Sequence, residues 1–549
     1  DINIEIKAAG GKGMKKKTLQ AAVIALGILS ASFTVSAMGK VNTENSVVPE
    51  TAEEVVGSVD SEKTQNISVD EMIKPEKLET DGEGEDKPKT GWVRDGENWK
   101  YRDENGDFVK NSWQEVGEFK YYFGEDGVMQ TGWIAPGDGN WYYAYADGAA
   151  QTDWFQAKDG RWYYANKDGV MQTGWIAPGD GNWYYAYADG AMQTGWFQAE
   201  NGRWYYANKD GVMQTGWIAP GDGNWYYAYA DGVMQTGWFT PGDGNWYYAN
   251  KDGVMQTNWF QAENGCWYYA NKDGVMQTGW IAPGDGNWYY AYADGAMQTG
   301  WIAPGDGNWY YAYADGAIQT GWILTGTDDW YYAYGNGAIA INTWEKMNGQ
   351  WYWFDESGLM AQGWKYIGRY KYYFDKSGYM LQDLGGVLGR QSSYEITVNR
   401  KRCQVMVYAK DGSNGYIIPV KTFTCSVGLP STPTPTGTFY TPNKYRWHTL
   451  MGPSYGQYCT RINGGILFHS VAGYNMTSYN IHARDYNKLG SPASHGCVRL
   501  NVRDAKWIYD NCSLGTKVTI SDSVATPFDK PATIKIPANQ NWDPTDPNI

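Results

Sequence analysis

Short aromatic runs alternate with glycine- and aspartate-rich turns along the middle of the chain, beginning at residue 91. The first tryptophan of each run recurs every 20 to 22 residues from Trp92 to Trp364, which defines fourteen units. In the unit 173–193, the turns Gly-Asp-Gly-Asn and Ala-Asp-Gly separate the aromatic segments. Asp-Gly favours tight hairpin turns because glycine tolerates a positive φ, so each unit is predicted to form a β-hairpin.

The regular spacing of these units also predicts how they assemble. A fixed period of this length is typical of a solenoid. A single hairpin is only marginally stable in water, so neighbouring hairpins must stack to bury one aromatic face. The pattern therefore predicts a β-hairpin solenoid of about 14 repeats over residues 90–383.

The pattern changes after Met380, where the aromatic repeats end. Alternating apolar and polar positions then predict strands at 394–398, 404–408, 416–420 and 421–427. A helix is predicted from Val502 to Asn511, with Asn501 as its N-terminal cap. A β-rich domain with one short helix is thus expected over residues 384–522. It is followed by a proline-rich tail, 523–549, which is expected to lie on the surface. The predicted fold class is all-β dominated.

The N-terminal region has the organisation of an export signal. Three lysines at 15–17 precede an apolar stretch at about 19–35, and Val-Ser-Ala at 35–37 resembles a cleavage site. Residues 14–37 are therefore predicted to be a signal peptide. An uncleaved membrane anchor is the alternative, although polar residues interrupt the stretch. The acidic, aromatic-poor residues 38–89 predict a disordered linker, and residues 1–13 are given no role.

Composition narrows the range of partners. The net charge of −15 argues against nucleic acid, because phosphate binding needs clustered Lys and Arg. The chain has 30 Trp and 46 Tyr but only 14 Phe, which indicates rings kept partly at the surface. A secreted protein is expected, with membrane contact only through the signal segment before its cleavage.

The cysteines and histidines show no metal-binding spacing. The six cysteines are Cys266, Cys403, Cys425, Cys459, Cys497 and Cys512. The sequence has no C-x-x-C pair and no H-E-x-x-H motif, so neither a metal nor a cofactor is predicted. A disulfide between Cys403 and Cys425 is conceivable in an exported protein. Small buried thiols are the alternative for these two and for Cys459 and Cys512.

A second tryptophan follows the first by eight positions in ten consecutive units. Across a hairpin the two rings can face each other, and an aromatic ring of the next unit can close a three-sided box. Such a box attracts quaternary ammonium groups, and Met171 and Met192 illustrate methionines that could line its remaining side. The predicted box residues are Trp133, Trp141, Trp154, Trp162, Trp175, Trp183, Trp196, Trp204, Trp217, Trp225, Trp238, Trp246, Trp259, Trp267, Trp280, Trp288, Trp301, Trp309, Trp322 and Trp330.

The pattern G-W-x(7)-W-Y-Y-x(4)-G-x-M resembles the choline-binding repeat family over about residues 90–382. The resemblance implies sites between consecutive hairpins that hold choline on teichoic acids. Related repeats bind glucan or other wall polysaccharides, and the terminal units at 119–123 and 370–374 are closer to that form. A third reading is that every tryptophan only packs the solenoid. Fourteen units favour multivalent binding, because linked weak sites gain avidity.

The segment 494–500, Ser-His-Gly-Cys-Val-Arg-Leu, carries the candidate chemistry of the C-terminal domain. Acyl transfer needs a thiolate, a nearby base and donors that face the oxyanion. Cys497 is the predicted nucleophile and His469 the predicted base, its second nitrogen oriented by the carbonyl or hydroxyl of Ser470. The N–H groups of Gly496 and Cys497 are the predicted oxyanion donors.

These residues, with Gly-Leu-Pro at 428–430 and the segment 434–439, resemble the L,D-transpeptidase family over about residues 388–522. The resemblance implies a β-sandwich-like fold. It also implies attack of Cys497 on the bond after the third residue of a peptidoglycan stem tetrapeptide, release of D-Ala, and a 3→3 cross-link to a neighbouring stem. Ser494, His495 and Arg499 are predicted to bind substrate, with Arg499 on a carboxylate.

The stretch between His469 and Cys497 departs from the family in being long, with residues 474–486 inserted. The insert is a candidate lid, and it brings His482 as an alternative base. His448 is predicted to be structural. Two other functions stay open: a hydrolase or L,D-carboxypeptidase that passes the acyl group to water, and an attachment protein with an inactive catalytic domain.

Overall fold

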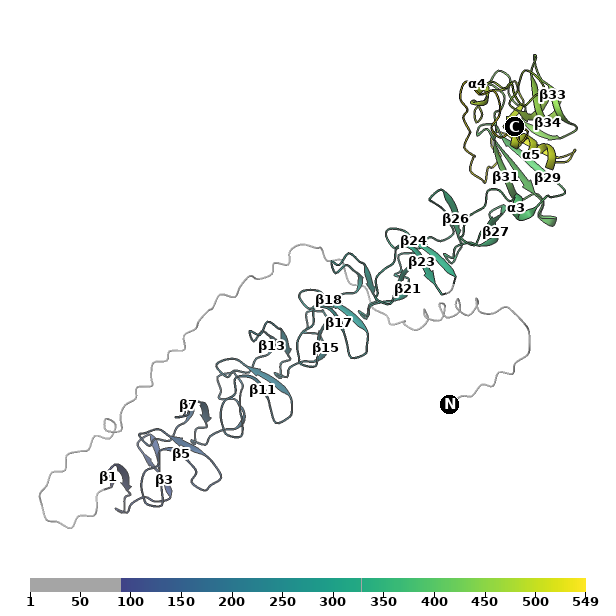
Figure 1. The fold of residues 1–549 in the computed structure, drawn as a ribbon. Coiled ribbons are helices and arrows are strands. Elements are labelled where there is room, and N and C mark those ends of the chain that lie inside the picture. Colours follow the sequence, from purple (N-terminus) through teal and green to yellow (C-terminus); the bar gives the residue numbers. More distant parts are fainter. Residues whose placement is uncertain (1–89, 327) are drawn as a thin grey trace, which may run out of the picture. The chain divides into compact units, whose positions relative to one another are not determined.

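The computed structural model describes residues 90–326 and 328–549, so the predicted signal peptide and linker lie outside the described residues. The chain divides into two units, 1–89 and 90–549, and the second contains all the elements drawn as ribbon in Figure 1. None of the helices described between residues 90 and 549 has the length and apolar character of a membrane span.

The prediction of fourteen hairpins is confirmed, since twenty-eight strands pair antiparallel, each with its neighbour in sequence, as fourteen two-stranded sheets. The strands are β1 Gly91–Asp95, β2 Asn98–Arg102, β3 Ser112–Val116, β4 Phe119–Phe123, β5 Gly132–Ile134, β6 Tyr142–Ala144, β7 Asp153–Gln156, β8 Trp162–Ala165, β9 Gly174–Ile176, β10 Tyr184–Ala186, β11 Gly195–Gln198, β12 Trp204–Ala207, β13 Gly216–Ile218, β14 Tyr226–Ala228, β15 Gly237–Phe239, β16 Tyr247–Ala249, β17 Asn258–Gln261, β18 Trp267–Ala270, β19 Gly279–Ile281, β20 Tyr289–Ala291, β21 Gly300–Ile302, β22 Tyr310–Ala312, β23 Gly321–Thr325, β24 Asp329–Ala333, β25 Thr343–Met347, β26 Gln350–Phe354, β27 Gly363–Ile367 and β28 Tyr370–Phe374.

Consecutive hairpins are joined by a methionine at the end of each typical unit. The N–H of Met213 donates to the carbonyl of Trp183 in the preceding unit at 2.8 Å. The side chain of Met213 packs against Gly232 of the following unit, where a Cβ would lie 2.2 Å from the sulfur. Gly232 has a φ of +77°, so the turn requires glycine for both its space and its conformation. The units therefore stack as the solenoid prediction requires.

The C-terminal region consists of a five-stranded sheet, β31-β30-β29-β37-β32, and a four-stranded sheet, β33-β34-β35-β36. Helix α5 contacts three strands of the second sheet, and one apolar core joins both sheets and the helix. This arrangement agrees with the expected β-sandwich-like domain with a short helix (Figure 1). Its elements are α3 Gly385–Leu388, β29 Tyr394–Asn399, β30 Gln404–Ala409, a 3₁₀ turn Gly412–Asn414, β31 Ile418–Thr424, β32 Gly437–Tyr440, β33 Lys444–Thr449, β34 Tyr455–Asn463, β35 Ile466–Ser470, α4 Ala483–Tyr486, β36 Val498–Leu500, α5 Val502–Asn511 and β37 Lys517–Ser521.

Helix α5 confirms its predicted bounds, and the Asn501 side chain accepts from the N–H of Asp504 at 2.8 Å. The prediction of two strands over 416–420 and 421–427 is wrong, because one strand, β31, covers 418–424. Lys421 does not interrupt it. Since β31 lies at the edge of its sheet, Lys421 can turn outward to the carboxylate of Asp383 at 2.5 Å.

The prediction that the tail 523–549 lies on the surface is confirmed for most of its residues, which are exposed or half-buried, but it fails at a few positions that anchor the tail. Phe528, Ile536 and Asp543 are buried. Phe528 belongs to a core cluster that combines aromatic residues of the last repeats with Tyr408 of β30. The Asp529 carboxylate accepts from Lys346 and Trp351 of the thirteenth unit at 2.9 and 2.8 Å. The tail lacks regular structure, but its apolar side chains belong to core clusters formed with other elements.

Candidate active site and repeat sites

The two predicted catalytic residues are brought together by neighbouring strands. β35 and β36 pair in parallel, with His469 opposite Arg499. Cys497 directly precedes β36. His469 and Cys497 thus line one cavity of about 320 Å³, although many residues separate them in sequence.

The surroundings of Cys497 favour the protonated form of its thiol. Burial raises the pKa of Cys497, whereas the N–H of Leu467 and the charge of Arg499 act in the opposite direction. The thiol donates to the carbonyl of Gly465 at 3.6 Å. Within the described residues no hydrogen bond joins it to His469.

His469 is 2% exposed and is held in one orientation by the main chain. Its Nδ1 lies 2.5 Å from the carbonyl oxygen of Ser470. A carbonyl only accepts, so Nδ1 carries the proton and Nε2 keeps a lone pair. Burial and the charge of Arg499 lower the pKa of His469 to about 4, which leaves the ring neutral and able to accept a proton.

Ser470 orients His469 through its carbonyl, one of the two predicted alternatives. The Ser470 hydroxyl has a different use. It accepts from the N–H of Gln457 at 2.9 Å and donates to the carbonyl of Val471 at 3.2 Å. Ser470 therefore fixes the end of β35 as well as the imidazole.

The loop before Cys497 is held by its own hydrogen bonds, and Ser494 of this loop also lines the cavity. The hydroxyl of the fully buried Ser494 donates to the Cys497 carbonyl at 2.6 Å and accepts from the Gly496 N–H at 3.1 Å. Ser494 thus shapes the loop, and its hydroxyl proton is not free for substrate. The Gly496 N–H is likewise engaged, so it is not a free oxyanion donor. Gly496 is needed for its φ of +116° and because a Cβ would lie 2.8 Å from Ile466.

The segment 428–434 is hydrogen-bonded to the loop before Cys497 and stabilises it. The N–H of Gly428 donates to the Thr434 hydroxyl at 2.8 Å. The N–H of Leu429 donates to the carbonyl of Ser494 at 2.9 Å. A Cβ at Gly428 would lie 2.1 Å from the carbonyl oxygen of Thr432, so the backbone segments at these two positions approach too closely for any residue other than glycine at 428.

The remaining predicted residues divide between the cavity and the surface. His495 and Arg499 line the cavity, and His495 is exposed at its mouth. His448 also lines the cavity, and its ring stacks on Tyr445 with centroids 4.4 Å apart. His482 is exposed at the start of α4, against Tyr474, and is not among the lining residues.

Sequence reasoning missed Arg461, which enters the cavity from β34. No strand was predicted over 455–463, so no pattern placed this residue near the site. Arg461 pairs with Leu467 of β35, next to the catalytic strand.

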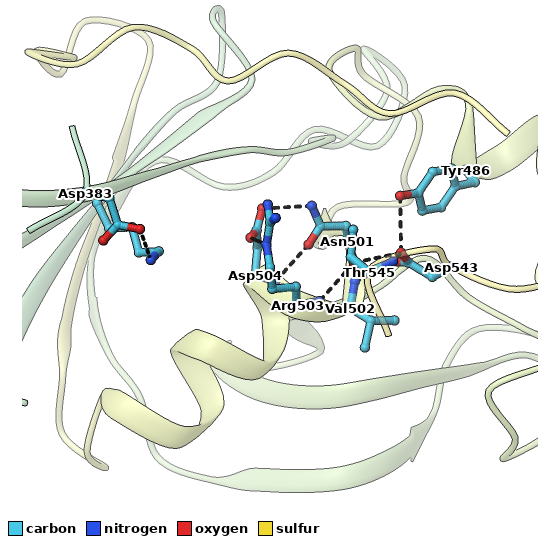
Figure 2. A network of polar contacts seen from close by, with 9 residues as sticks. Asp383, Tyr486, Asn501, Val502, Arg503, Asp504, Asp543 and Thr545 are labelled. Carbon is cyan, nitrogen blue, oxygen red and sulfur yellow. Dashed lines mark hydrogen bonds and ion pairs between the residues drawn. The ribbon is translucent and has the colours of Figure 1, made fainter. Parts of the chain in front are cut away.

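The insert 474–486 is tied to the tail and to the start of α5 (Figure 2). The Tyr486 hydroxyl donates to the Asp543 carboxylate at 3.2 Å, and the N–H of Val502 donates to the same carboxylate at 2.7 Å. The hydroxyl of Thr545 adds a third donor at 2.7 Å. Asp543 therefore links the insert to the segment that follows Cys497.

The repeats build the expected aromatic walls. In the ten units whose second tryptophan follows the first by eight positions, the centroid of the first ring lies 4.7–4.9 Å from that of the tyrosine that follows the second tryptophan of the next unit. The two tryptophans of one unit contact each other at 6.2–6.4 Å in five units, as the pairs Trp133–Trp141, Trp175–Trp183, Trp217–Trp225, Trp280–Trp288 and Trp322–Trp330. The described structure shows no such contact in the other five.

One box forms a distinct cavity of about 450 Å³. Trp175, Trp183 and Tyr205 supply its rings, and Met213 and Asp231 complete the lining. Eight of the ten second tryptophans are 45–55% exposed, so about half of each of these rings remains accessible to a ligand.

All six cysteines are free thiols in this structure. Cys403 and Cys425 are neighbours, joined by a backbone hydrogen bond of 2.9 Å, but they are not bonded through sulfur. Cys459 and Cys512 are buried and Cys266 is exposed. The alternative reading of small buried thiols therefore describes the four structural cysteines in this structure.

Comparison with known families agrees with both halves of the chain. Residues 393–520 match the L,D-transpeptidase catalytic domain, and residues 110–155 match the choline-binding repeat. Eleven further segments match the cell wall binding repeat, at 152–171, 173–192, 194–213, 215–234, 236–255, 257–276, 278–297, 299–318, 320–339, 342–360 and 362–380.

Two similar proteins carry the L,D-transpeptidase name. YciB of Bacillus subtilis (strain 168) is 39% identical over 140 residues, which cover 24% of this chain and 68% of YciB. L,D-transpeptidase 1 of Mycobacterium tuberculosis (strain ATCC 25618 / H37Rv) is 27% identical over 111 residues, which cover 20% of this chain and 43% of that protein.

Two solved structures are similar to the repeat region. CbpJ from Streptococcus pneumoniae TIGR4 is 29% identical with a TM-score of 0.37, covering 46% of this chain and 100% of that one. Choline binding protein F from Streptococcus pneumoniae is 33% identical with a TM-score of 0.31, covering 50% of this chain and 99% of that one. The family assignment follows from the matched repeats and from the similarity to YciB. The chain belongs to the L,D-transpeptidase family and carries choline-binding repeats before its catalytic domain.

Proposed function

We propose that this protein is an exported peptidoglycan L,D-transpeptidase that forms 3→3 cross-links through a Cys497 acyl-enzyme. The observation that carries the proposal is the shared cavity of Cys497 and a neutral, carbonyl-oriented His469. A neutral imidazole next to a protonated thiol acts as a general base when the substrate closes the gap between them.

The reaction has two balanced halves. His469 Nε2 accepts the thiol proton as Sγ attacks the carbonyl carbon of the third stem residue, which forms the amide bond to D-Ala. The tetrahedral intermediate then expels the D-Ala amine, which takes the proton from His469, and a thioester remains. An amine of a second stem attacks the thioester, His469 takes its proton, and the amide forms as the thiol is restored. The N–H of Cys497 is the loop donor proposed for the oxyanion, because the Gly496 N–H is engaged.

Mass spectrometry with a defined disaccharide tetrapeptide tests this proposal. The wild-type protein is expected to gain the mass of the disaccharide tetrapeptide minus that of D-Ala, and to release cross-linked dimers, because the thioester is passed to an amine. Cys497→Ala should give neither product. Tripeptide monomers without dimers would instead support the L,D-carboxypeptidase alternative, and an unchanged Cys497→Ala variant would remove the thiol from the mechanism.

For the repeats we propose binding of choline on teichoic acids, with glucan or another wall polysaccharide as the alternative. Asp231 lines the aromatic box of Trp175, Trp183 and Tyr205. A carboxylate beside three rings favours a cation over a neutral sugar, since both the charge and the ring faces attract it. Many such sites in one chain would hold the enzyme at the wall by avidity.

Elution from choline-decorated walls distinguishes these ligands. Free choline is expected to release the protein. Its neutral isostere 3,3-dimethyl-1-butanol, at equal concentration, should release far less, because each cation–π contact contributes roughly 0.5–2 kcal/mol that requires the charge. The readout is the bound fraction of full-length protein after washing. Release by soluble glucan but not by choline would refute the choline assignment.

A further inference from the structure

Two guanidinium groups face the active-site cavity from the strands on either side of β35. Arg461 of β34 pairs with Leu467, and Arg499 of β36 pairs with His469. Leu467 and His469 lie two residues apart on β35, and paired residues project to the same side of a sheet. All four side chains therefore share the face of the sheet that lines the cavity.

Both arginines keep hydrogen-bonding capacity that the protein does not use. The Nε atoms of Arg461 and Arg499 are buried without a partner. Within the described residues the Arg499 side chain has no hydrogen bond or ion pair at all, although the charge of Asp485 acts on it from outside the cavity lining. Unpaired buried N–H groups are costly, so a ligand is expected to satisfy them.

The cavity is cationic although the whole chain is acidic. Arg461 and Arg499 contribute two positive charges, and no acidic side chain is among the described residues that line the cavity. The net charge of the chain is −15. This local reversal of sign points to an anionic group on the substrate.

Arg461 is also held in position before any ligand binds. Its Nη1 donates to the carbonyl of Gly464, and its Nη2 lies 3.5 Å from the Tyr445 hydroxyl and 3.4 Å from His448 Nε2. The guanidinium carbon lies 5.5 Å from the centre of the Tyr445 ring. A planar guanidinium fixed in this way at the cavity wall can interact with a carboxylate at little entropic cost.

We infer that Arg461, together with Arg499, binds the free C-terminal carboxylate of the donor stem peptide. This inference rests on the proposed transpeptidase function. In a tetrapeptide donor that carboxylate belongs to the leaving D-Ala, about one residue length (~3.8 Å) from the scissile carbonyl. Both arginines line the same cavity as Cys497, so a carboxylate one residue from the attacked carbonyl lies in the space that they border. The subsite thus selects donors with a free terminal acid.

The test compares two donors that differ only at the terminus, the tetrapeptide acid and its C-terminal carboxamide. Wild-type protein is expected to acylate with the acid about 10- to 100-fold faster, as for a lost charged hydrogen bond. Arg461→Met should slow acylation by the acid by about the same factor and leave the rate of acylation by the amide nearly unchanged. The ratio of the two acylation rates then approaches one. Arg461→Lys should be intermediate. Arg402→Met, which removes an exposed charge in a turn away from the cavity, serves as the control.

The ratio separates recognition from structural damage. If Arg461→Met were misfolded, it would lose acylation by the acid and by the amide equally, and Arg461→Lys would then decide the question. A folded Arg461→Met or Arg461→Lys protein that keeps the wild-type acid-to-amide ratio would overturn the inference. Equal wild-type rates for acid and amide would overturn it too, while the transpeptidase proposal would stand. Absence of any acyl-enzyme in the wild type would refute the proposed function and the inference with it.

Discussion

Replacement of His469 by glutamine is expected to slow formation of the Cys497 acyl-enzyme by about 10²- to 10⁴-fold, the usual contribution of a general base. The amide of glutamine can fill part of the imidazole space but cannot accept the thiol proton. Because burial raises the Cys497 pKa, the thiol does not ionise unaided near neutral pH. Single-turnover mass spectrometry of the acyl-enzyme measures the effect directly.

The pH profile of the same reaction identifies which histidine acts. The base must be neutral, and the pKa of His469 is lowered to about 4. Wild-type kcat/KM should therefore hold as pH falls through 6.5 and decline only as pH falls through about 4. His469→Gln should lose this acidic limb. The matched variant His482→Gln, on the exposed insert, should keep both rate and profile; a large loss there would make His482 the base instead.

The repeat array could be predicted almost completely from the sequence, because its information is local. Each hairpin is specified by Asp-Gly turns and aromatic runs within one unit, and the tryptophan period alone gives the stacking partner. Packing details did not follow from the pattern. Only five of the ten tryptophan pairs contact each other. Asp231, which lines the box of Trp175 and Trp183, comes from a unit two positions further along the chain.

The catalytic site was only partly predictable, because its parts come from distant strands. A cysteine after His-Gly and an upstream His-Ser mark Cys497 and His469 in the sequence. The uses of Ser494 and Gly496 depend on the loop's own hydrogen bonds, which a motif does not show. Arg461 lies on a strand whose register alone brings it to the cavity.

Removal of the tail, residues 523–549, is expected to leave the catalytic domain unfolded or nearly so at 37 °C. Phe528 fills a core cluster and Ile536 is 6% exposed against the insert, with its backbone paired to the Asn487 side chain at 2.9 Å. Losses of roughly 3–5 kcal/mol for a buried Phe and 2–5 kcal/mol for a buried Ile approach the 5–15 kcal/mol that holds a typical domain together.

The tail itself offers a matched pair of variants for this experiment. Ile536→Ala should lower the stability of the catalytic domain by about 2–5 kcal/mol, whereas Ile534→Ala, at a side chain 44% exposed, should change it by less than about 0.5 kcal/mol. Near-ultraviolet circular dichroism during thermal unfolding reports the loss of tertiary packing. If both variants and the truncated chain unfolded at the same temperature as the wild type, the tail would not contribute to the stability of the catalytic domain. A selective effect of Ile536 would instead show that these residues belong to the folded domain and, through Asp543, hold the insert beside the segment that carries Cys497.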